Sequence, residues 1–557
     1  MNAFILLLIG SLPLVLAVFA GQRYARWITV IAPLPALVGA AALPVGTSVS
    51  LPWLLLGTEL GLDDTGRVFL FFSALLWLVA SLYAAGSMGS ERNATRFRIF
   101  FLLAMSGNLG LIVAQDMVTF YLGFTLMGLA VYGLIAHRAS QCARQAAGRY
   151  LVWTIAGELL LFVAVVLLVA QNGGATAFSV LKSNPPVGFV VLLLVIGFGI
   201  KLALPGLHLW LPQSYAVAPT PAVAVLSGAM IKAGLLGWLR FLPPGDAALA
   251  GWGQALTVAG VIGIFFGAIV GLRQQRPRLL LGYSSISKMG VLTAGMGAAL
   301  TWPVAAPALV GALALYAAHH ALVKGALFLG LGLAERGGLR PWILAGLGFL
   351  ALALAGAPLT SGALAKSVLT AGLPEPARSL AFLLAASALA TTLLMARLLF
   401  LIWRQRGSVA SPHPVSSVAA WLTLLAVIAV FPFALADAGQ LSANLVPVSL
   451  GALLAVLALL VAGRLPGRAT PRSRHTAGGR PARRSARATR QLAHAAQFMV
   501  GRLRSAWHNP YRGVRVALRR RWIRSWQSGA GEDRWPLAGS LWLGIGGLLL
   551  TALTLLA

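Results

Sequence analysis

The chain has 557 residues, of which 59% are hydrophobic and 10% are charged, and its formal net charge is +31. Apolar runs of about 20 residues recur along it, which is the length that crosses the hydrocarbon core of a bilayer as an α-helix. These features exclude a soluble fold and predict an all-α polytopic membrane protein.

The predicted membrane spans cover most of the chain in order. We predict 16 transmembrane helices, with edges uncertain by several residues, at 3–20, 27–43, 67–86, 98–114, 117–136, 149–170, 187–211, 219–242, 250–272, 279–299, 303–333, 342–370, 377–403, 415–436, 447–463 and 537–557.

Loop charge predicts the orientation, because Lys and Arg near span ends stay on the cytoplasmic side. The loops after odd-numbered spans carry arginine pairs, namely Arg23 and Arg26, Arg92 and Arg96, Arg138 and Arg144, Arg273 and Arg276, Arg336 and Arg340, and Arg404 and Arg406. The loops after even-numbered spans are acidic apart from Lys182, Arg240 and Arg378. We therefore expect a multi-pass protein of the bacterial cytoplasmic (inner) membrane with both termini outside.

Much of the positive charge lies near the end of the chain, where 18 arginines fall between Arg464 and Arg534. Residues 464–484 have the composition of a flexible linker. Apolar residues interleaved with arginine over 485–530 predict a basic amphipathic helix on the cytoplasmic face, bound to anionic lipid headgroups. Nucleic-acid binding is the alternative, and interleaved tryptophans followed by a further span argue against it.

Redox and hydrolytic chemistry have no visible site. Cys142 is the only cysteine, so the sequence predicts no disulfide and no thiolate metal or haem site. It also contains no phosphate-binding loop and no plausible dinucleotide fingerprint. We expect no cofactor and no metal, and energy for uphill transport would come from an ion gradient or a partner subunit.

Lysine is rare and unusually placed. Five of the six lysines lie within apolar stretches, at Lys201, Lys232, Lys288, Lys324 and Lys366. An amine at mid-membrane depth costs about 2.5–3.5 kcal/mol on insertion scales, so a function is its default explanation. The alternative is a high-GC genome that uses Arg for Lys, with lysine ends reaching the interface.

The surroundings of these lysines favour a function. Lys201 precedes Pro205 by one turn and Lys366 follows Pro358 and a glycine, so both lie beside predicted helix breaks, which membranes tolerate next to protein or water. Lys232 lies midway along its span. His320 and Lys324 are spaced i, i+4 and share a helix face, which favours a proton relay over a satisfied core histidine. Hydroxyl residues flank Lys288 and would either hold water or bond to their own helix.

Five runs carry a resemblance to a known family: FGIKLALPGLHLWLP, APTPAVAVLSGAMIKAG, LLLGYSSISKMG, HALVKGALFLG and GAPLTSGALAK. They resemble the antiporter-like subunits of respiratory complex I, formate-hydrogenlyase-type membrane hydrogenases and Mrp-type cation/proton antiporters. The resemblance implies two inverted five-helix repeats, each with a broken helix that carries a key lysine. It also implies a polar axis along the membrane, to which we assign Lys201, Lys232, His320, Lys324 and Lys366, with Lys288 and His208 as further candidates.

The sequence also departs from this family. Thr125 occupies the site of the span-5 glutamate that pairs with Lys201, and Gln213 and Tyr316 replace an aspartate and a histidine. Loss of the carboxylate removes an interaction that favours a charged lysine. Glu158 is the obvious remaining mid-membrane carboxylate, and we predict that it forms an ion pair with Lys201.

Together these observations predict a proton- or monovalent-cation-translocating subunit of a multisubunit membrane complex. The alternatives are an ion-coupled subunit of an inorganic-carbon uptake complex, or a structural scaffold with a degenerate channel. The predicted parts are the first three helices (1–97), two repeats (98–242 and 250–403), two further helices (415–463), the Arg-rich linker and amphipathic helix (464–535) and a final anchor (537–557).

Overall fold

The computed structural model describes residues 1–88, 91, 93–337, 340–404, 413–435 and 445–464. The chain separates into two units, Met1–Pro466 and Gly467–Ala557. The predicted linker, amphipathic helix and last span lie outside the described residues, so the account below concerns the first unit alone.

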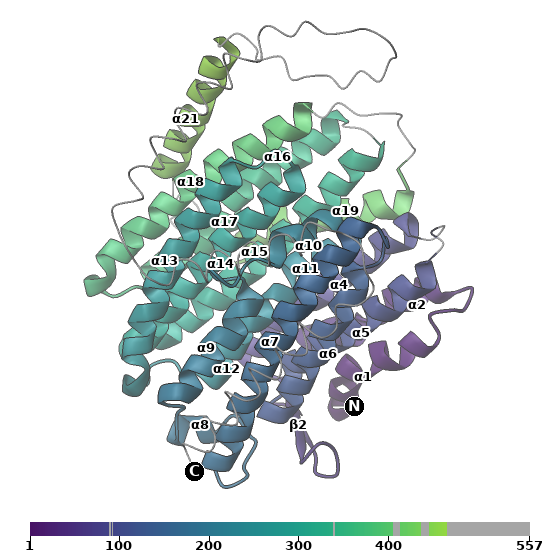
Figure 1. Ribbon diagram of the computed structural model, residues 1–557, viewed down its shortest axis with the longest axis vertical. Coiled ribbons are helices and arrows are strands. Elements are labelled where there is room, and N and C mark those ends of the chain that lie inside the picture. Colours follow the sequence, from purple (N-terminus) through teal and green to yellow (C-terminus); the bar gives the residue numbers. More distant parts are fainter. Residues whose placement is uncertain (89–90, 92, 338–339, 405–412, 436–444, 465–557) are drawn as a thin grey trace, which may run out of the picture. The chain divides into compact units, whose positions relative to one another are not determined.

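The described part of this unit is almost entirely helical (Figure 1). It begins with α1 (Asn2–Val18), α2 (Ala25–Ile31), α3 (Leu34–Ala42), α4 (Asp64–Ser87), α5 (Ala94–Val113) and α6 (Met117–Ile135). Between α3 and α4 the chain forms an antiparallel hairpin of β1 (Ser48–Leu51) and β2 (Thr58–Gly61), in which Ser48 faces Gly61. This hairpin is an addition to the predicted all-α architecture, confined to one loop.

The middle of the unit contains several short helices. In order they are α7 (Gln141–Gln171), α8 (Val180–Ser183), α9 (Gly188–Leu202), α10 (Leu211–Val217), α11 (Thr220–Gly228), the 3₁₀ turn η1 (Met230–Lys232), α12 (Ala233–Phe241) and η2 (Ala247–Leu249).

The remaining described helices follow. They are α13 (Ala250–Leu272), α14 (Pro277–Thr301), η3 (Pro303–Ala305), α15 (Ala306–Gly337), α16 (Pro341–Ala355), α17 (Ser361–Ala371), η4 (Glu375–Ala377), α18 (Arg378–Arg404), α19 (Val415–Leu435) and α21 (Leu445–Arg464).

Many of these helices suit a bilayer. Within the described residues, 10 helical segments are long and apolar enough to cross a membrane, and four shorter apolar helices accompany them at Asn2–Val18, Gly188–Leu202, Pro341–Ala355 and Leu445–Leu457. The protein is therefore a multi-pass membrane protein. The sequence-based number of 16 spans stays a prediction.

Two helices are interrupted beside a lysine. After α9 the backbone turns left-handed at Ala203 (φ 56°) and Gly206 (φ 89°), on either side of Pro205. After α16 it does the same at Gly356 (φ 85°) and Leu359 (φ 63°), on either side of Pro358. Proline supplies no backbone N–H and left-handed residues end a helix, so each span divides into two short helices.

Glycines hold α13 directly against α14. A Cβ on Gly260 would lie 2.4 Å from the backbone nitrogen of Ala294, and one on Gly267 would lie 2.5 Å from that of Ser287. Small residues allow such close backbone approach in membranes, where packing takes over from the hydrophobic effect. Helix α14 also packs against α10, α15 and α18 (Figure 1). Most of its side chains are buried, which places Lys288 inside the bundle.

Candidate functional site

Lys201 occupies the last turn of α9, immediately before the break. Its side chain is buried, and Nζ donates a hydrogen bond of 3.4 Å to the hydroxyl of Tyr150. The same Nζ lies 5.2 Å from the ring centre of Phe124 and 5.8 Å from that of Tyr150. Tyr150 in turn donates to the Gly128 carbonyl oxygen at 2.8 Å. Aromatic faces attract a cation, so two rings and a hydroxyl surround this amine.

Glu158 lies on α7, as Tyr150 does, and its charge acts on Lys201. No nitrogen–oxygen contact within 4.0 Å joins them among the described residues, although their charges interact. Oε1 of Glu158 is buried without a hydrogen-bond partner, and it lies so close to Gly128 that a Cβ there would be 2.1 Å away. The ion pair of Glu158 with Lys201 stays a prediction, and in this structure the hydroxyl of Tyr150, on the same helix, accepts the amine's hydrogen bond.

Thr125 is half-buried on α6. Its neighbour Phe124 presents the ring to Lys201. A π face thus lies beside the lysine, and it attracts a cation more weakly than a carboxylate would.

Three other lysines donate to backbone carbonyl oxygens. Nζ of Lys232 bonds to Ser227 O at 2.6 Å, that of Lys324 to Leu281 O at 2.8 Å, and that of Lys366 to Ala355 O at 2.5 Å. Ser227 lies in the last turn of α11 and Ala355 ends α16, where carbonyls have no partner within the helix. The helix ends therefore supply acceptors for two of these amines.

Two buried histidines and Lys288 complete this region. His319 Nδ1 lies 2.9 Å from the Ser361 hydroxyl at the start of α17. Both ring nitrogens of His320, and Nζ of Lys288, are buried without a hydrogen-bond partner among the described residues. His319 was missed by the sequence reasoning, which took only His320. The adjacent pair of histidines was the signal that could have indicated it.

The candidate residues fall into two groups by their electrostatic interactions. Glu158 and Lys201 act on each other. A second group of six buried residues interact among themselves through Lys288 and the two histidines; we call it the central cluster, and it consists of Lys232, Lys288, His319, His320, Lys324 and Lys366. The structure therefore brings together five of the predicted residues and one missed residue.

His208 contacts aromatic residues that belong to neither of these two groups. It follows the α9 break, and its ring centre is 4.9 Å from that of Phe266 on α13 and 6.3 Å from that of Tyr283 on α14. Its ring thus packs among aromatic side chains.

An ion pair joins the start of α4 to the end of α12. Arg240 donates two hydrogen bonds to the Asp63 carboxylate, at 2.5 and 2.9 Å, and the backbone N–H of Gly66 donates a third. Burial raises the pKa of Asp63, but the hydrogen bond and charge of Arg240 outweigh it, so the pKa lies below its ordinary value. This pair anchors α12, which follows Lys232.

Comparison with known proteins gives consistent results. Residues 114–375 match the family described as NADH:quinone oxidoreductase/Mrp antiporter, TM. NADH-quinone oxidoreductase subunit N of Desulforudis audaxviator is 32% identical over 50% of this chain and 56% of its own length. Hydrogenase-4 component B of Escherichia coli is 28% identical over 49% of this chain and 43% of its own length. The chain thus matches about half the length of these relatives.

A solved structure shares the fold. The Mrp complex of Dietzia sp. DQ12-45-1b contains a chain that superposes with a TM-score of 0.70 at 23% identity, covering 98% of this chain and 66% of that one. The matched family region contains both lysine groups, from Glu158 to Lys366. Residues 114–375 of the chain are therefore similar to the family described as NADH:quinone oxidoreductase/Mrp antiporter, TM.

Proposed function

We propose that the chain is a proton-translocating subunit of a multisubunit membrane complex. The observation that carries this proposal is the central cluster: six titratable side chains, each fully or almost fully buried, that interact electrostatically within one helical bundle. Structural need does not account for so many buried amines, because each costs free energy that an apolar side chain would avoid.

The arrangement suits stepwise proton transfer. His320 interacts with Lys232, Lys324 and Lys288, and His319 interacts with Lys288 and Lys366. A proton on one amine repels a proton on the next, so the occupancies of neighbouring sites are coupled. In the proposed sequence protons enter at Lys232 and Lys324, pass by way of the histidines and Lys288, and leave at Lys366.

Glu158 and Lys201 would act as a separate switch beside this cluster. Lys201 is held by a tyrosine hydroxyl and two rings, and the Glu158 oxygen has no partner. A movement at the α9 break would bring the carboxylate and the amine together, because the left-handed residue Ala203 lies two residues after Lys201. Such a movement would change the charge seen by the rest of the axis.

The finer architecture belongs to the same proposal. It comprises 16 spans, inverted repeats at 98–242 and 250–403, and an amphipathic helix within 464–535 on anionic lipid. It places the protein in the bacterial inner membrane with both termini outside. The interruptions that follow α9 and α16 support the repeats, since a buried lysine lies beside each of them, Lys201 before the first and Lys366 after the second.

Other membrane subunits are the proposed partners. The similar proteins are named as subunits or components of an oxidoreductase and a hydrogenase, and the Mrp structure is a complex. A complex of this kind would provide the energy source, and the transported ion would be the proton in preference to Na⁺.

Replacing Lys366 with Met tests the proposal against the scaffold alternative. We expect Lys366→Met to abolish proton translocation by membrane vesicles while the full chain still copurifies with its partner subunits. Lys182→Met is the matched control, because Lys182 is exposed on α8 and lies outside the cluster. Unchanged translocation in Lys366→Met would favour the scaffold.

A further inference from the structure

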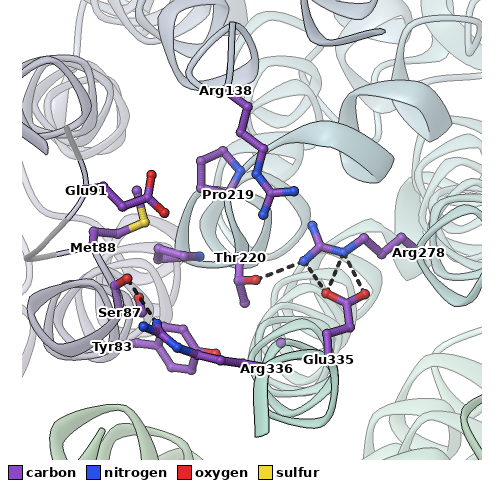
Figure 2. Close-up of a pocket in the computed structure, with 12 residues that line it drawn as sticks. Tyr83, Ser87, Met88, Glu91, Arg138, Pro219, Thr220, Arg278, Glu335 and Arg336 are labelled. Carbon is purple, nitrogen blue, oxygen red and sulfur yellow. Dashed lines mark hydrogen bonds and ion pairs between the residues drawn. The ribbon is translucent and has the colours of Figure 1, made fainter. Parts of the chain in front are cut away.

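A polar cavity opens at the arginine-rich end of the bundle, on the predicted cytoplasmic side (Figure 2). It has a volume of about 270 Å³ and is lined by Arg138, Arg278 and Arg336 together with Glu91 and Glu335. We call it the arginine pocket. A polar space of this size holds several waters, since one water occupies about 30 Å³ in the liquid.

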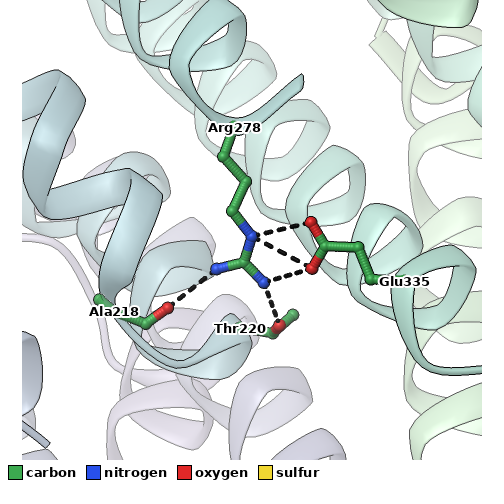
Figure 3. Close-up of polar contacts among 4 residues, drawn as sticks. All are labelled: Ala218, Thr220, Arg278 and Glu335. Carbon is green, nitrogen blue, oxygen red and sulfur yellow. Dashed lines mark hydrogen bonds and ion pairs between the residues drawn. The ribbon is translucent and has the colours of Figure 1, made fainter. Parts of the chain in front are cut away.

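An ion pair closes one wall of the arginine pocket (Figure 3). Arg278, at the start of α14, donates to both carboxylate oxygens of Glu335 at the end of α15, over distances of 2.6–3.1 Å. It also donates to the Ala218 carbonyl oxygen at 2.9 Å and the Thr220 hydroxyl at 3.0 Å. Arg278 thus joins the ends of the three helical segments that lead inward to the central cluster.

The central cluster begins one helical turn below this wall. Nζ of Lys324 donates to the Leu281 carbonyl oxygen, and Leu281 follows Arg278 by three residues, which is about 4.5 Å along the axis of α14. The Ser285 hydroxyl bonds to the same carbonyl at 3.1 Å. Below it, the buried hydroxyl of Ser284 and Nζ of Lys288 have no partner among the described residues. Polar atoms therefore follow α14 from the pocket to the cluster.

The charges in the arginine pocket favour cation exclusion. Three arginines face two glutamates, and no described residue pairs with Arg138 (Figure 2). Arg336 donates to the Ser87 carbonyl oxygen and forms no ion pair with any residue that the structure describes. A net positive entrance repels Na⁺, whereas a proton can pass through water and a carboxylate without a free cation entering.

We propose that the arginine pocket is the proton-uptake mouth of the chain, with Glu335 as the transient proton acceptor and its arginines as a filter against Na⁺. This inference rests on the proposed function. Glu335 takes a proton from a hydronium ion in the pocket, which becomes water, and the neutral carboxylic acid no longer forms an ion pair with Arg278. The carboxylic acid then passes that proton through water to neutral Lys324. The O–H bond of Glu335 breaks, an N–H bond forms on Lys324, and the ion pair between Glu335 and Arg278 forms again.

Replacing Glu335 tests the mouth in proteoliposomes that contain the full chain with the subunits it retains. Under an imposed membrane potential, Glu335→Gln should lower proton flux by about tenfold or more, because the amide cannot accept the proton. Glu335→Asp should restore a substantial part of the flux. Glu375→Gln is the matched control, because Glu375 forms an exposed i, i+3 pair with Arg378 elsewhere on the chain, and it should leave the flux unchanged. Thermal unfolding of each variant checks that it is folded.

The sodium filter has its own measurement. Radioactive sodium uptake should be absent in the wild type and should appear in Arg138→Gln, while proton flux persists. Wild-type flux in Glu335→Gln would overturn the mouth, and absent sodium uptake in Arg138→Gln would overturn the filter. Lys366→Met separates these results from the proposed function: if it blocks flux and Glu335→Gln does not, only the mouth fails. If Lys366→Met conducts normally, the proposed function fails.

Discussion

Lys288→Met should stabilise the protein while it removes transport. Lys288 is 1% exposed in the middle of α14, and its Nζ has no hydrogen-bond partner among the described residues. Its charge would also repel the charges of Lys324 and Lys366, with which it interacts electrostatically. Methionine has a similar length and flexibility but carries no charge and no donor, so it fills the same space without the cost of an unpaired buried amine.

The size of the gain follows from the surroundings. An amine at mid-membrane depth costs about 2.5–3.5 kcal/mol on insertion scales, and replacing buried charges by apolar residues stabilises proteins by up to about 4 kcal/mol. Allowing for imperfect packing of the new side chain, we expect a gain of about 1–3 kcal/mol. Lys366→Met should gain about 1 kcal/mol less, because it also removes the hydrogen bond to Ala355.

Reversible unfolding of the purified chain in mixed micelles measures these free energies. Lys182→Met provides the reference, because a substitution at this exposed residue should stay within about 0.5 kcal/mol of wild type. A loss of stability in Lys288→Met would refute the reasoning, since it would mean that the amine makes a favourable interaction inside the bundle. A gain in stability with normal proton flux would separate Lys288 from the transport path.

Three further outcomes are expected. Gly260→Ala should destabilise the protein by about 1–3 kcal/mol, because the new Cβ would lie 2.4 Å from the backbone nitrogen of Ala294 and would force α13 away from α14; Gly148→Ala, with open space around it, should not. Unfolding free energies distinguish the two. The pKa of Asp63 is lowered in the folded state, so its contribution is present above the ordinary value of 3.8 and disappears as the pH falls through the folded value. The stability difference between wild type and Asp63→Asn, measured against pH, should therefore shrink on acidification, and a constant difference would contradict this. Arg278→Lys should cost about 1–3 kcal/mol in the same unfolding assay, because an ammonium cannot reproduce the fork of bonds to a carboxylate, a carbonyl and a hydroxyl; an unchanged stability would mean that the fork contributes little.

Much of the fold could be predicted from local sequence. Apolar length indicated the positions of the helices. Pro205 and Pro358, each within two residues of a glycine, indicated the two interruptions because proline lacks a backbone N–H and disfavours a continuous helix. The conversion to a 3₁₀ turn at Lys232 had no such signal, since no proline lies between Pro221 and Pro243. The hairpin before α4 was missed because its strands are only four residues long.

The sequence indicated which residues form the candidate site, but it indicated fewer of the contacts that those residues make. Burial of the lysines followed from their apolar surroundings. The partner of Lys201 did not, because Tyr150 and Glu158 are eight residues apart on one face of α7 and the packing of α7 against α9 decides which of them reaches the amine. Likewise, Arg278 and Glu335 are 57 residues apart, so only the tertiary structure shows that they close one pocket.

Proton flux through Lys324→Met tests the central claim most directly. Lys324 interacts electrostatically with Lys232, Lys288 and His320. Its Nζ donates to the carbonyl oxygen of Leu281, which lies about one helical turn from Arg278 in the arginine pocket. In proteoliposomes of the full chain under an imposed potential, the account predicts that this variant loses about tenfold or more of the wild-type flux, while Lys182→Met retains it. Equal flux in the two variants would contradict proton transfer through the buried lysines.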